Sequence, residues 1–460
     1  MSGKKELFKP IIPNKVRLFV CGPTVYDFSH IGHARAYLAF DLFARYLKSK
    51  GLDVYYLQNI TDIDDKIIKR AAETQTSWKQ LSERFTKEYQ KNMKELEIVN
   101  VNRYAKATEH IREIVSQVER LVNLGAAYRI DDGIYFDVSK FKNYGRLSKR
   151  SALQAEDAVS RIDDAKSKKN KADFCLWKFY SGIESEPKWS SQWGWGRPGW
   201  HIEDTAITEK YFGPQYDIHG GGRDLIFPHH EAEIAQMETL SNKSPMVKYW
   251  MHVGFLTTKS QKMSKSLANF VTINDFLKQY PARLLRYFFL KVNYRSPIDY
   301  NEESISQAQN DLARIDEFIQ RLNINPSKEN NKKIDSILKR AQREFTLSLD
   351  DDLNTPKALA AIFELIKNIN PLIDTNSLSK NDIKKTLDSL KSFDQVFGFI
   401  FVKAIKKKAI PKEIKDLADQ RRKFRKAKQW DKADELRKAI EEKGYILKDT
   451  ANKYVLQKKG

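Results

Sequence analysis

Cysteine is scarce in this sequence, with only Cys21 and Cys175 among 460 residues. Two thiols cannot form a disulfide framework of the kind that stabilises small secreted domains, so we expect a reducing, cytoplasmic setting. Long apolar runs are also missing, since none reaches the roughly 18 residues of a membrane-spanning helix. The opening residues, MSGKKELFKP, lack the apolar segment of a secretory signal. Together these absences argue against a membrane partner.

Acidic residues are too few to balance the basic ones. The chain has 81 Lys and Arg against 60 Asp and Glu, which gives a net charge of +21. The excess is marked in residues 401–460, where 20 basic and 9 acidic residues give +11. A basic surface of this kind favours a polyanionic partner, first of all a nucleic acid. A lysine-rich proteome would produce the same balance without such a partner.

The N-terminal part of the chain has a pattern typical of an α/β fold. Residues 16–20 and 53–60 are apolar and β-prone, and residues 34–46 between them predict a helix with Ser29 as its N-cap. A strand, a helix and a second strand in this order form a parallel unit with a right-handed crossover. Ligands of such units bind at the carboxyl ends of the strands, and phosphates bind at the helix N-terminus.

The C-terminal part is predicted to be helical. Leu, Ile and Phe recur there at helical spacing and predict a bundle. Beyond the bundle we expect two charged helices within 412–443 and a hairpin formed by 445–447 and 454–456. The bundle helices are expected at 302–323, 333–349, 355–369 and 379–398.

Two short motifs point to nucleotide chemistry. His30 and His33 lie three residues apart in the first helical turn, so both can donate hydrogen bonds to phosphates. About 230 residues later, the string KMSKS at 262–266 sets two lysines around small hydroxyl residues, as a loop that neutralises a triphosphate requires. Alone, such a string is more often a solvated loop. Together and in this order, the two motifs resemble those of the class I aminoacyl-tRNA synthetases.

Four further segments narrow the resemblance to the cysteinyl-tRNA synthetase family. They are CGPT at 21–24, NITDIDDK at 59–66, GRPGWHIE at 196–203 and FPHHEAE at 227–233. The resemblance covers nearly the whole chain and implies a Rossmann-type parallel-sheet catalytic domain with a connective insertion, followed by a helical bundle and a small C-terminal anticodon-binding domain. The expected boundaries are 1–130 for the first half of the catalytic domain, 131–195 for the insertion, 196–256 for the second half, 257–300 for the KMSKS loop and stem-contact region, 301–402 for the bundle and 403–460 for the anticodon-binding domain.

The resemblance also implies an activity. Members of the family activate cysteine with ATP to cysteinyl-adenylate and transfer it to the 3′-terminal ribose of cysteine tRNA, with Mg2+ accompanying ATP. Thr61 and Trp200 would bind the amino acid, and we expect a monomer. The ATP-binding residues would be His30, Gly32, His33, Lys262, Ser264 and Lys265, of which His30, His33, Lys262 and Lys265 would be catalytic.

A cluster of basic and aromatic residues in the tail predicts where tRNA binds. Arg421, Arg422 and Arg425 can contact phosphates while Trp430 stacks on a base. For any one of these residues, a solvated helix surface is the alternative interpretation.

A metal site is predicted from His229 and Glu233, whose i, i+4 spacing puts both side chains on one helical face. A cysteine thiolate is a donor that zinc favours. The resemblance implies a zinc site made of Cys21, His229, Glu233 and a second cysteine, but Asp204 occupies the place of that cysteine. Either the carboxylate of Asp204 completes the set, or only three ligands remain. The metal would bind the thiolate of the substrate and thereby reject serine.

Other interpretations of these motifs remain open. A lone cysteine at a strand end is usually a packed core residue, and the string HHEAE matches neither zinc-protease pattern. The glycines at 220–222 lack the G-x-G-x-x-G spacing, so we expect them to let the backbone approach a ligand. Two rivals are a ligase that joins cysteine to a small amine and a non-catalytic RNA-binding relative. The predicted bundle and basic tail argue against the first, and the intact phosphate-binding motifs argue against the second.

Overall fold

The computed structural model describes residues 3–150, 167–258, 261–262, 270–323, 325–401, 411–427, 429–449 and 454–458. The chain divides into two compact units, Met1–Ile400 and Phe401–Gly460. Within the described ranges, none of the helices combines the length and the apolar character needed to cross a membrane.

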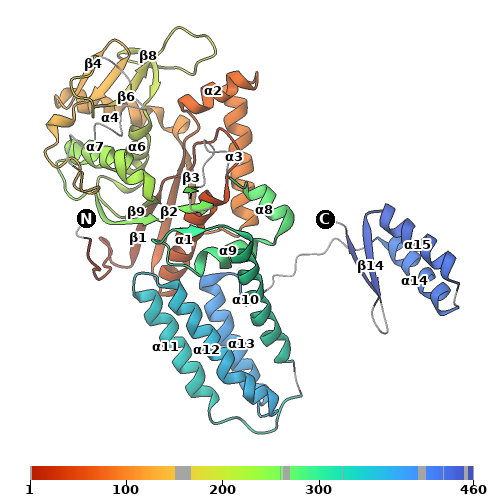
Figure 1. The fold of residues 1–460 in the computed structure, drawn as a ribbon. Helices are drawn as coiled ribbons and strands as arrows, with labels where there is room; N and C mark the ends of the chain where they lie inside the picture. The colour runs from red at the N-terminus through yellow and green to blue at the C-terminus, as the bar shows by residue number, and fades with distance from the viewer. Residues whose placement is uncertain are drawn as a thin grey trace. The chain divides into compact units, whose positions relative to one another are not determined.

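The larger unit is built on a five-stranded parallel sheet with the order β10-β9-β1-β2-β3 (Figure 1). The strands are β1 (Lys15–Val20), β2 (Asp53–Ile60), β3 (Arg103–Lys106), β9 (Tyr216–Gly222) and β10 (Val247–Val253). β2 and β3 follow β1 on one side of it, and the later strands β9 and β10 lie on its other side. The sheet therefore has a topological switch point between β1 and β9, which is where open α/β sheets bind ligands. This arrangement confirms the predicted Rossmann-type fold.

Helix α1 (Ile31–Ser49) follows β1 and begins one residue later than a cap at Ser29 would place it. The N-cap is His30, whose backbone N–H lies 3.3 Å from Nδ1 of His33, so the predicted Ser29 cap is wrong. The carbonyl of Ser29 instead accepts a hydrogen bond of 2.9 Å from the backbone N–H of Ile273. Ser29 thus ties the start of α1 to a segment that is distant in sequence.

A second sheet, entirely antiparallel, has the order β4-β5-β6-β8-β7. Its strands are β4 (Ala127–Ile130), β5 (Gly133–Phe136), β6 (Phe174–Phe179), β7 (Trp189–Ser191) and β8 (Gly194–Pro198). The helices of this part of the chain are α2 (Asp65–Glu73), α3 (Trp78–Glu95), α4 (Ile111–Asn123), α6 (Trp200–Phe212) and α7 (Glu231–Ser241), with a short helical turn η4 (Ile226–His230) leading into α7.

Helices α6 and α7 lie between the two sheets. On α6, Ile202 and Ala206 join the hydrophobic core beneath the antiparallel sheet, whereas Ile207 joins the core on the parallel sheet. On α7, Ala235 joins the core of the antiparallel sheet and Ile234 joins the core of the parallel sheet. Both helices are therefore covered on opposite sides, so polar side chains in their middle turns are removed from water. Their acidic residues need partners inside the protein.

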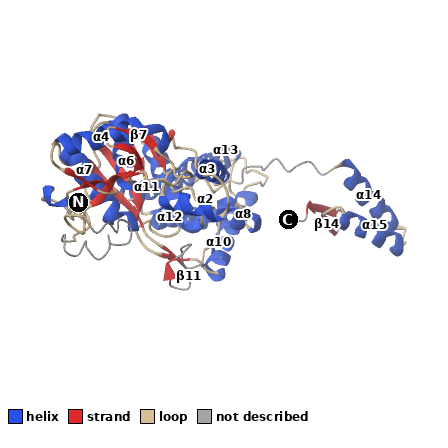
Figure 2. Cartoon of the chain, turned by 90° about the horizontal axis from the view of Figure 1, so that it is seen from above, coloured by secondary structure: helices blue, strands red, loops and turns tan. Residues whose placement is uncertain are grey.

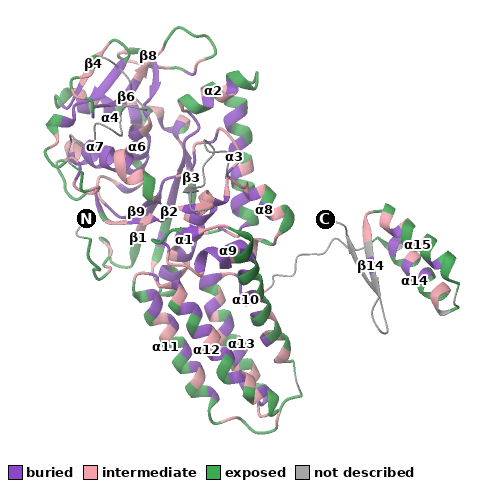
Figure 3. Cartoon of the chain, viewed as in Figure 1, coloured by how far each residue is buried: buried purple, intermediate pink, exposed green. Residues whose placement is uncertain are grey.

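The helical part of the larger unit forms the bundle. Its helices are α8 (Ile273–Gln279), α9 (Ala282–Leu290), α10 (Glu302–Arg321), α11 (Ile334–Asp350), α12 (Thr355–Asp374) and α13 (Lys380–Phe397). Buried and exposed residues alternate along them as stripes, which follows from the helical spacing of their apolar residues (Figure 3). A small three-stranded sheet is formed by β11 (Leu256–Thr258), β12 (Gln261–Lys262) and β13 (Ile298–Asp299). In the chain, β11 and β12 come before α8, and β13 comes between α9 and α10.

The smaller unit contains α14 (Lys412–Lys426), α15 (Trp430–Glu442) and an antiparallel pair, β14 (Tyr445–Asp449) and β15 (Tyr454–Lys458) (Figure 2). Its core consists of Ile414, Ala418, Ile440 and Leu447. This small apolar core joins the two charged helices to β14, so the unit has the two helices and the hairpin that the sequence predicts.

Candidate functional site

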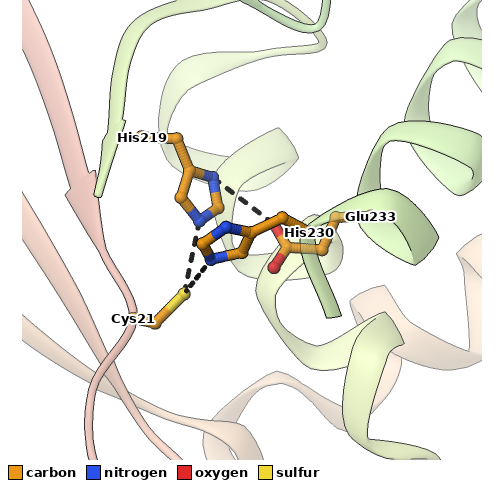
Figure 4. Close-up of side chains that lie close together, drawn as sticks. All are labelled: Cys21, His219, His230 and Glu233. Atoms are coloured by element: carbon orange, nitrogen blue, oxygen red, sulfur yellow. Dashed lines mark hydrogen bonds and ion pairs between the residues drawn. The ribbon is translucent and has the colours of Figure 1, made fainter. Parts of the chain in front are cut away.

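Cys21 lies directly after β1, at the switch point of the parallel sheet, and two imidazoles face its sulfur. Nε2 of His219, from β9, and Nε2 of His230, from η4, each lie 3.3 Å from Sγ of Cys21 (Figure 4). The other nitrogen of each ring is also held. Nδ1 of His219 lies 2.6 Å from the hydroxyl of Tyr216, and Nδ1 of His230 lies 2.9 Å from Nε2 of His252. Partners of this kind fix how an imidazole is oriented.

His229 faces the opposite side of the same buried space. Its Nε2 lies 3.0 Å from Oδ2 of Asp204 on α6 and 3.0 Å from Oε1 of Glu233 on α7. Trp200 stacks on the His229 ring, with centroids 4.2 Å apart and planes 18° apart. Nδ1 of His229 is 2.9 Å from Nδ1 of His201. These contacts hold the His229 imidazole between the two carboxylates.

Two overlapping sets of four ligand atoms result. Cys21, Asp204, His229 and Glu233, the residues that the sequence singles out, have ligand atoms within 4.8 Å of one another. A second set keeps Cys21 and Glu233 but takes His219 and His230 instead, and its atoms meet the same limit. The sequence analysis missed His219 and His230. Their positions in the sequence could have indicated them. His219 directly precedes the glycines at the end of a buried strand, and His230 directly follows His229.

Five acidic residues are buried on α6 and α7, and their partners divide them into two groups. Glu231 accepts hydrogen bonds from the backbone N–H groups of Gly145 and Ser148, and Glu238 accepts one from that of Met246. The other three acids, Glu203, Asp204 and Glu233, all line the site and are at most 1% exposed.

These three acids retain oxygens without a hydrogen-bond partner. Among the residues that the structure describes, none donates to Oε1 of Glu203 or to Oδ1 of Asp204. Neither oxygen of Glu233 accepts a hydrogen bond there, although imidazole nitrogens lie 3.0 Å and 3.4 Å away. Buried, unsatisfied carboxylate oxygens are costly, so such a site fits a bound cation.

The electrostatics of the site also fit a cation. Burial lowers the pKa of His201, His219 and His230 well below its usual range, and that of His252 to about 4. These four imidazoles are therefore neutral near pH 7, and neutral imidazole is the form that binds metal. Burial, followed by the charges of Asp204 and Glu233, raises the pKa of the Cys21 thiol well above its usual value. A divalent cation among these groups would reverse the effect on the thiol.

Three of the predicted ATP-binding residues, His30, Gly32 and His33, lie at the N-terminus of α1. The rings of His30 and His33 stack with centroids 3.8 Å apart and planes 19° apart. A Cβ at Gly32 would lie 2.8 Å from Nδ1 of His30, so glycine is required for this stacking. The backbone N–H of Ile31 donates to the carbonyl of Val271 at 2.9 Å. The chain segment after the KMSKS string is thus attached directly beside the two histidines.

The KMSKS string itself is described only in part. The backbone of Lys262 belongs to β12 and pairs with Thr257 of β11. The side chain of Lys262, together with Ser264 and Lys265, lies outside the described residues. Phe270, where the described chain resumes, has its ring centroid 6.3 Å from that of His30. The described chain that follows the KMSKS string therefore resumes beside His30 and Ile31, at the start of α1.

Thr61 directly follows β2 and pairs with Thr24, in the loop that begins at Cys21. Its hydroxyl donates to Oε2 of Glu203 at 3.0 Å and accepts from Nδ2 of Asn59 at 3.3 Å. Oδ1 of Asn59 in turn accepts from the backbone N–H of Gly22 at 2.5 Å. Burial, followed by the charges of Asp204 and Asp64, raises the pKa of Glu203 well above its usual range. This network connects the predicted substrate residue Thr61 to the loop that carries Cys21.

One of the glycines at 220–222 has a packing role. A Cβ at Gly220 would lie 2.2 Å from the ring of Phe40 on α1. Gly220 therefore lets an aromatic ring pack closely against β9, and the expectation that these glycines let the backbone approach a ligand stays a prediction. Cys175 is buried, as the packing interpretation predicts.

The predicted tRNA-binding residues of the smaller unit are not equivalent. Trp430 is 55% exposed, and the guanidinium of Arg425 lies 5.8 Å from the centroid of its ring. Arg422 is exposed as well. Arg421 is buried, with 3% of its surface exposed, and Arg425 is half-buried. Arg422 and Trp430 are therefore the exposed members of the predicted set, and Arg421 is the least accessible.

The chain is similar to known proteins over almost its whole length. Residues 7–310 match the family described as tRNA synthetases class I (C) catalytic domain, and residues 344–402 match the DALR domain. The chain is 43% identical over 463 residues to the cysteine–tRNA ligase of Thermococcus gammatolerans, with 98% of this chain and 96% of the relative covered. Identity to the cysteine–tRNA ligase of Carboxydothermus hydrogenoformans is 42% over 458 residues, with coverage of 98% and 97%.

Solved structures share the fold at much lower identity. Methionyl-tRNA synthetase of Mycobacterium tuberculosis in complex with methionyl-adenylate has a TM-score of 0.60 and 17% identity, covering 84% of this chain and 90% of that one. LeuRS of Agrobacterium radiobacter, in a ternary complex with tRNA and LeuAMS, has a TM-score of 0.62 and 11% identity, with 86% of each chain covered. At these identities the likeness concerns the fold alone.

Proposed function

The chain belongs to the cysteinyl-tRNA synthetase family of class I aminoacyl-tRNA synthetases, and on that premise we propose that it selects its substrate with a zinc ion held by Cys21, Asp204, His229 and Glu233. It is a ligase that joins cysteine to tRNA. The observation that carries the zinc proposal is the group of buried carboxylate oxygens without hydrogen-bond donors around His229. Zinc, when bound, supplies a Lewis acid for the substrate thiolate, which a serine hydroxyl cannot match at neutral pH. The size of a cavity alone would separate the two amino acids by only about 1–3 kcal/mol.

The reaction has two steps, and the protein's part in both is to position groups and balance charge. In the first, the carboxylate of cysteine attacks the α-phosphate of ATP, and pyrophosphate leaves. His30 and His33 donate hydrogen bonds to the phosphates, while Lys262 and Lys265 neutralise the charge on the leaving group, with Mg2+ bound to ATP. In the second, a hydroxyl of the terminal ribose of tRNA attacks the carbonyl of the adenylate, and AMP leaves.

The remaining assignments complete the proposal. Gly32 and Ser264 contribute to ATP binding, and Thr61 and Trp200 bind the amino acid. Arg422, Arg425 and Trp430 contact tRNA from the smaller unit, whose charge suits a polyanion. We place the protein in the cytoplasm as a monomer. A ligase that joins cysteine to a small amine would not need this basic unit.

Cysteine-dependent exchange of pyrophosphate into ATP, followed by charging of a tRNA with the cysteine anticodon, tests the proposal. We expect both reactions with cysteine and neither with serine. Cys21→Ala should lose zinc and cysteine activation together, whereas Cys175→Ala, the matched removal of the other buried thiol, should keep both. Normal exchange by a zinc-free Cys21→Ala protein would overturn the zinc proposal. Exchange without tRNA charging by the unmodified chain would favour the small-amine ligase.

A further inference from the structure

Glu203 is a buried carboxyl group for which the described structure offers no cationic partner. The side chain is 1% exposed, in the first turn of α6. Its strongest electrostatic neighbours are the carboxylates of Asp204, Asp64 and Asp62, all of the same sign. Asp62 is satisfied by the hydroxyl and the backbone N–H of Thr108, and Asp64 by the N–H of Lys66 at the start of α2. Oε1 of Glu203 accepts nothing from any described residue.

The metal set does not account for Glu203. Both sets of possible ligands contain Glu233, and one contains Asp204, but neither contains Glu203. Its other oxygen, Oε2, is engaged by the hydroxyl of Thr61 at 3.0 Å. A buried acceptor without a donor therefore remains beside the metal set, next to both Glu203 and Thr61.

The hydrogen bonds of Thr61 indicate what that group can be. A hydroxyl has one proton and two lone pairs. The proton of Thr61 points to Glu203, and one lone pair receives Nδ2 of Asn59 at 3.3 Å. What remains on Thr61 is one acceptor site, beside the free acceptor Oε1 of Glu203. Two adjacent acceptors, one of them a carboxyl oxygen, fit a cation with several N–H donors, such as an alkylammonium group.

We infer that Glu203 binds the α-ammonium group of the amino-acid substrate through Oε1, and that it fixes the Thr61 hydroxyl so that this oxygen accepts a second hydrogen bond from the same group. The inference rests on the proposed function, because it takes cysteine as the substrate. Thiol and ammonium are then recognised by adjacent residues of one helical turn. Asp204 lies on the metal side and Glu203 on the side of Thr61.

Two competitors of cysteine in pyrophosphate exchange test this inference. Cysteamine keeps the thiol and the ammonium but lacks the carboxylate, and 3-mercaptopropionate keeps the thiol and the carboxylate but lacks the ammonium. Glu203→Gln should raise KM for cysteine and Ki for cysteamine by about ten- to a hundredfold, because a hydrogen bond to a charged group is lost. Ki for 3-mercaptopropionate should stay within about twofold of its original value. Thr61→Val should give the same pattern with a smaller effect.

Glu209→Gln is the matched control, since Glu209 lies on the same helix and pairs with Arg120 at the surface. It should leave all three constants unchanged. Equal losses for both competitors in Glu203→Gln would assign the residue a structural role, and an unchanged KM for cysteine would remove it from the site. Either result overturns the inference. If Glu203→Gln fails to fold, the same three constants measured for Thr61→Val test the inference instead. Failure of the unmodified chain to exchange with cysteine would instead contradict the proposed function.

Discussion

Nε2 of His229 and Oδ2 of Asp204 lie 3.0 Å apart, with both side chains almost completely buried. The motifs of the family place a cysteine where this chain has Asp204, so one thiolate of the expected zinc site is replaced by a carboxylate. The carboxylate is a harder donor than the thiolate, and zinc binds both. The proposed zinc site would therefore have one sulfur, one nitrogen and two carboxylate ligands.

Restoring the second thiolate should strengthen zinc binding. We expect Asp204→Cys to lower the Kd for zinc by about tenfold or more, and Asp204→Ala to raise it by about ten- to a hundredfold. Competition with a chromophoric chelator measures both constants. In the cobalt-substituted protein, Asp204→Cys should also increase sulfur-to-metal charge-transfer absorption. Zinc affinity that is the same in all three proteins would show that Asp204 is not a ligand.

The two overlapping sets of ligands can be separated by two histidine variants. His229 faces the carboxylates of both Asp204 and Glu233 at 3.0 Å. His219 faces the sulfur of Cys21 with Nε2, and its Nδ1 is held by Tyr216 at 2.6 Å and lies 3.4 Å from Glu233. We therefore expect His229→Gln to lose zinc on dialysis, and His219→Gln to retain about one zinc per chain with weaker affinity. Metal analysis after dialysis measures the content. The reverse result would place the metal on His219 and His230.

A buried ion pair anchors α1 to the bundle. Asp41 on α1 accepts from Arg286 on α9 at 2.8 Å, and both side chains are at most 1% exposed. Breaking such a pair leaves a buried charge, so Asp41→Asn should lower the free energy of unfolding of the larger unit by about 3–5 kcal/mol at pH 7. Urea unfolding followed by circular dichroism measures the difference. Asp388→Asn, which removes an exposed ion pair with Lys391, should change it by less than about 1 kcal/mol.

The same pair has a defined dependence on pH. Burial would raise the pKa of Asp41, but Arg286 and Arg45 outweigh it and hold the pKa below the usual value of 3.8. A group whose pKa is lowered by folding stabilises the protein above its unfolded pKa and loses this effect as the pH falls through its folded pKa. The difference between the original chain and Asp41→Asn should thus be constant from pH 7 to 5 and shrink below pH 3.8. A difference that changes between pH 7 and 5 would contradict this assignment.

The order of strands and helices could be predicted because it depends on local patterns. Apolar strands flank an apolar helix at the N-terminus, and the bundle helices lie close to their predicted ranges. The sequence could not reveal which glycine serves packing. The closeness of Gly220 to Phe40 depends on how α1 lies across β9, which is a tertiary relationship.

Part of the candidate site could not be predicted either, because it also depends on tertiary packing. The metal set was predicted because the family motifs carry Cys21, His229 and Glu233, and the structure brings their ligand atoms together. Glu203 was not singled out, since an acidic residue near the start of a helix ordinarily lies in water. It is buried only because α6 is packed against both sheets. Burial from both sides is set by topology and leaves no periodic signal in the sequence.

Arg422 and Arg425 of the smaller unit should control how tRNA binding depends on salt. Each phosphate contact releases counterions, so Arg422→Ala with Arg425→Ala should raise KM for tRNA and reduce the slope of log affinity against log salt by about two. Pyrophosphate exchange with cysteine, which needs no tRNA, should not change. Arg437→Ala is the control, because this exposed arginine is paired with Glu441 on α15. An unchanged slope in the double variant would mean that tRNA phosphates are bound elsewhere in the chain.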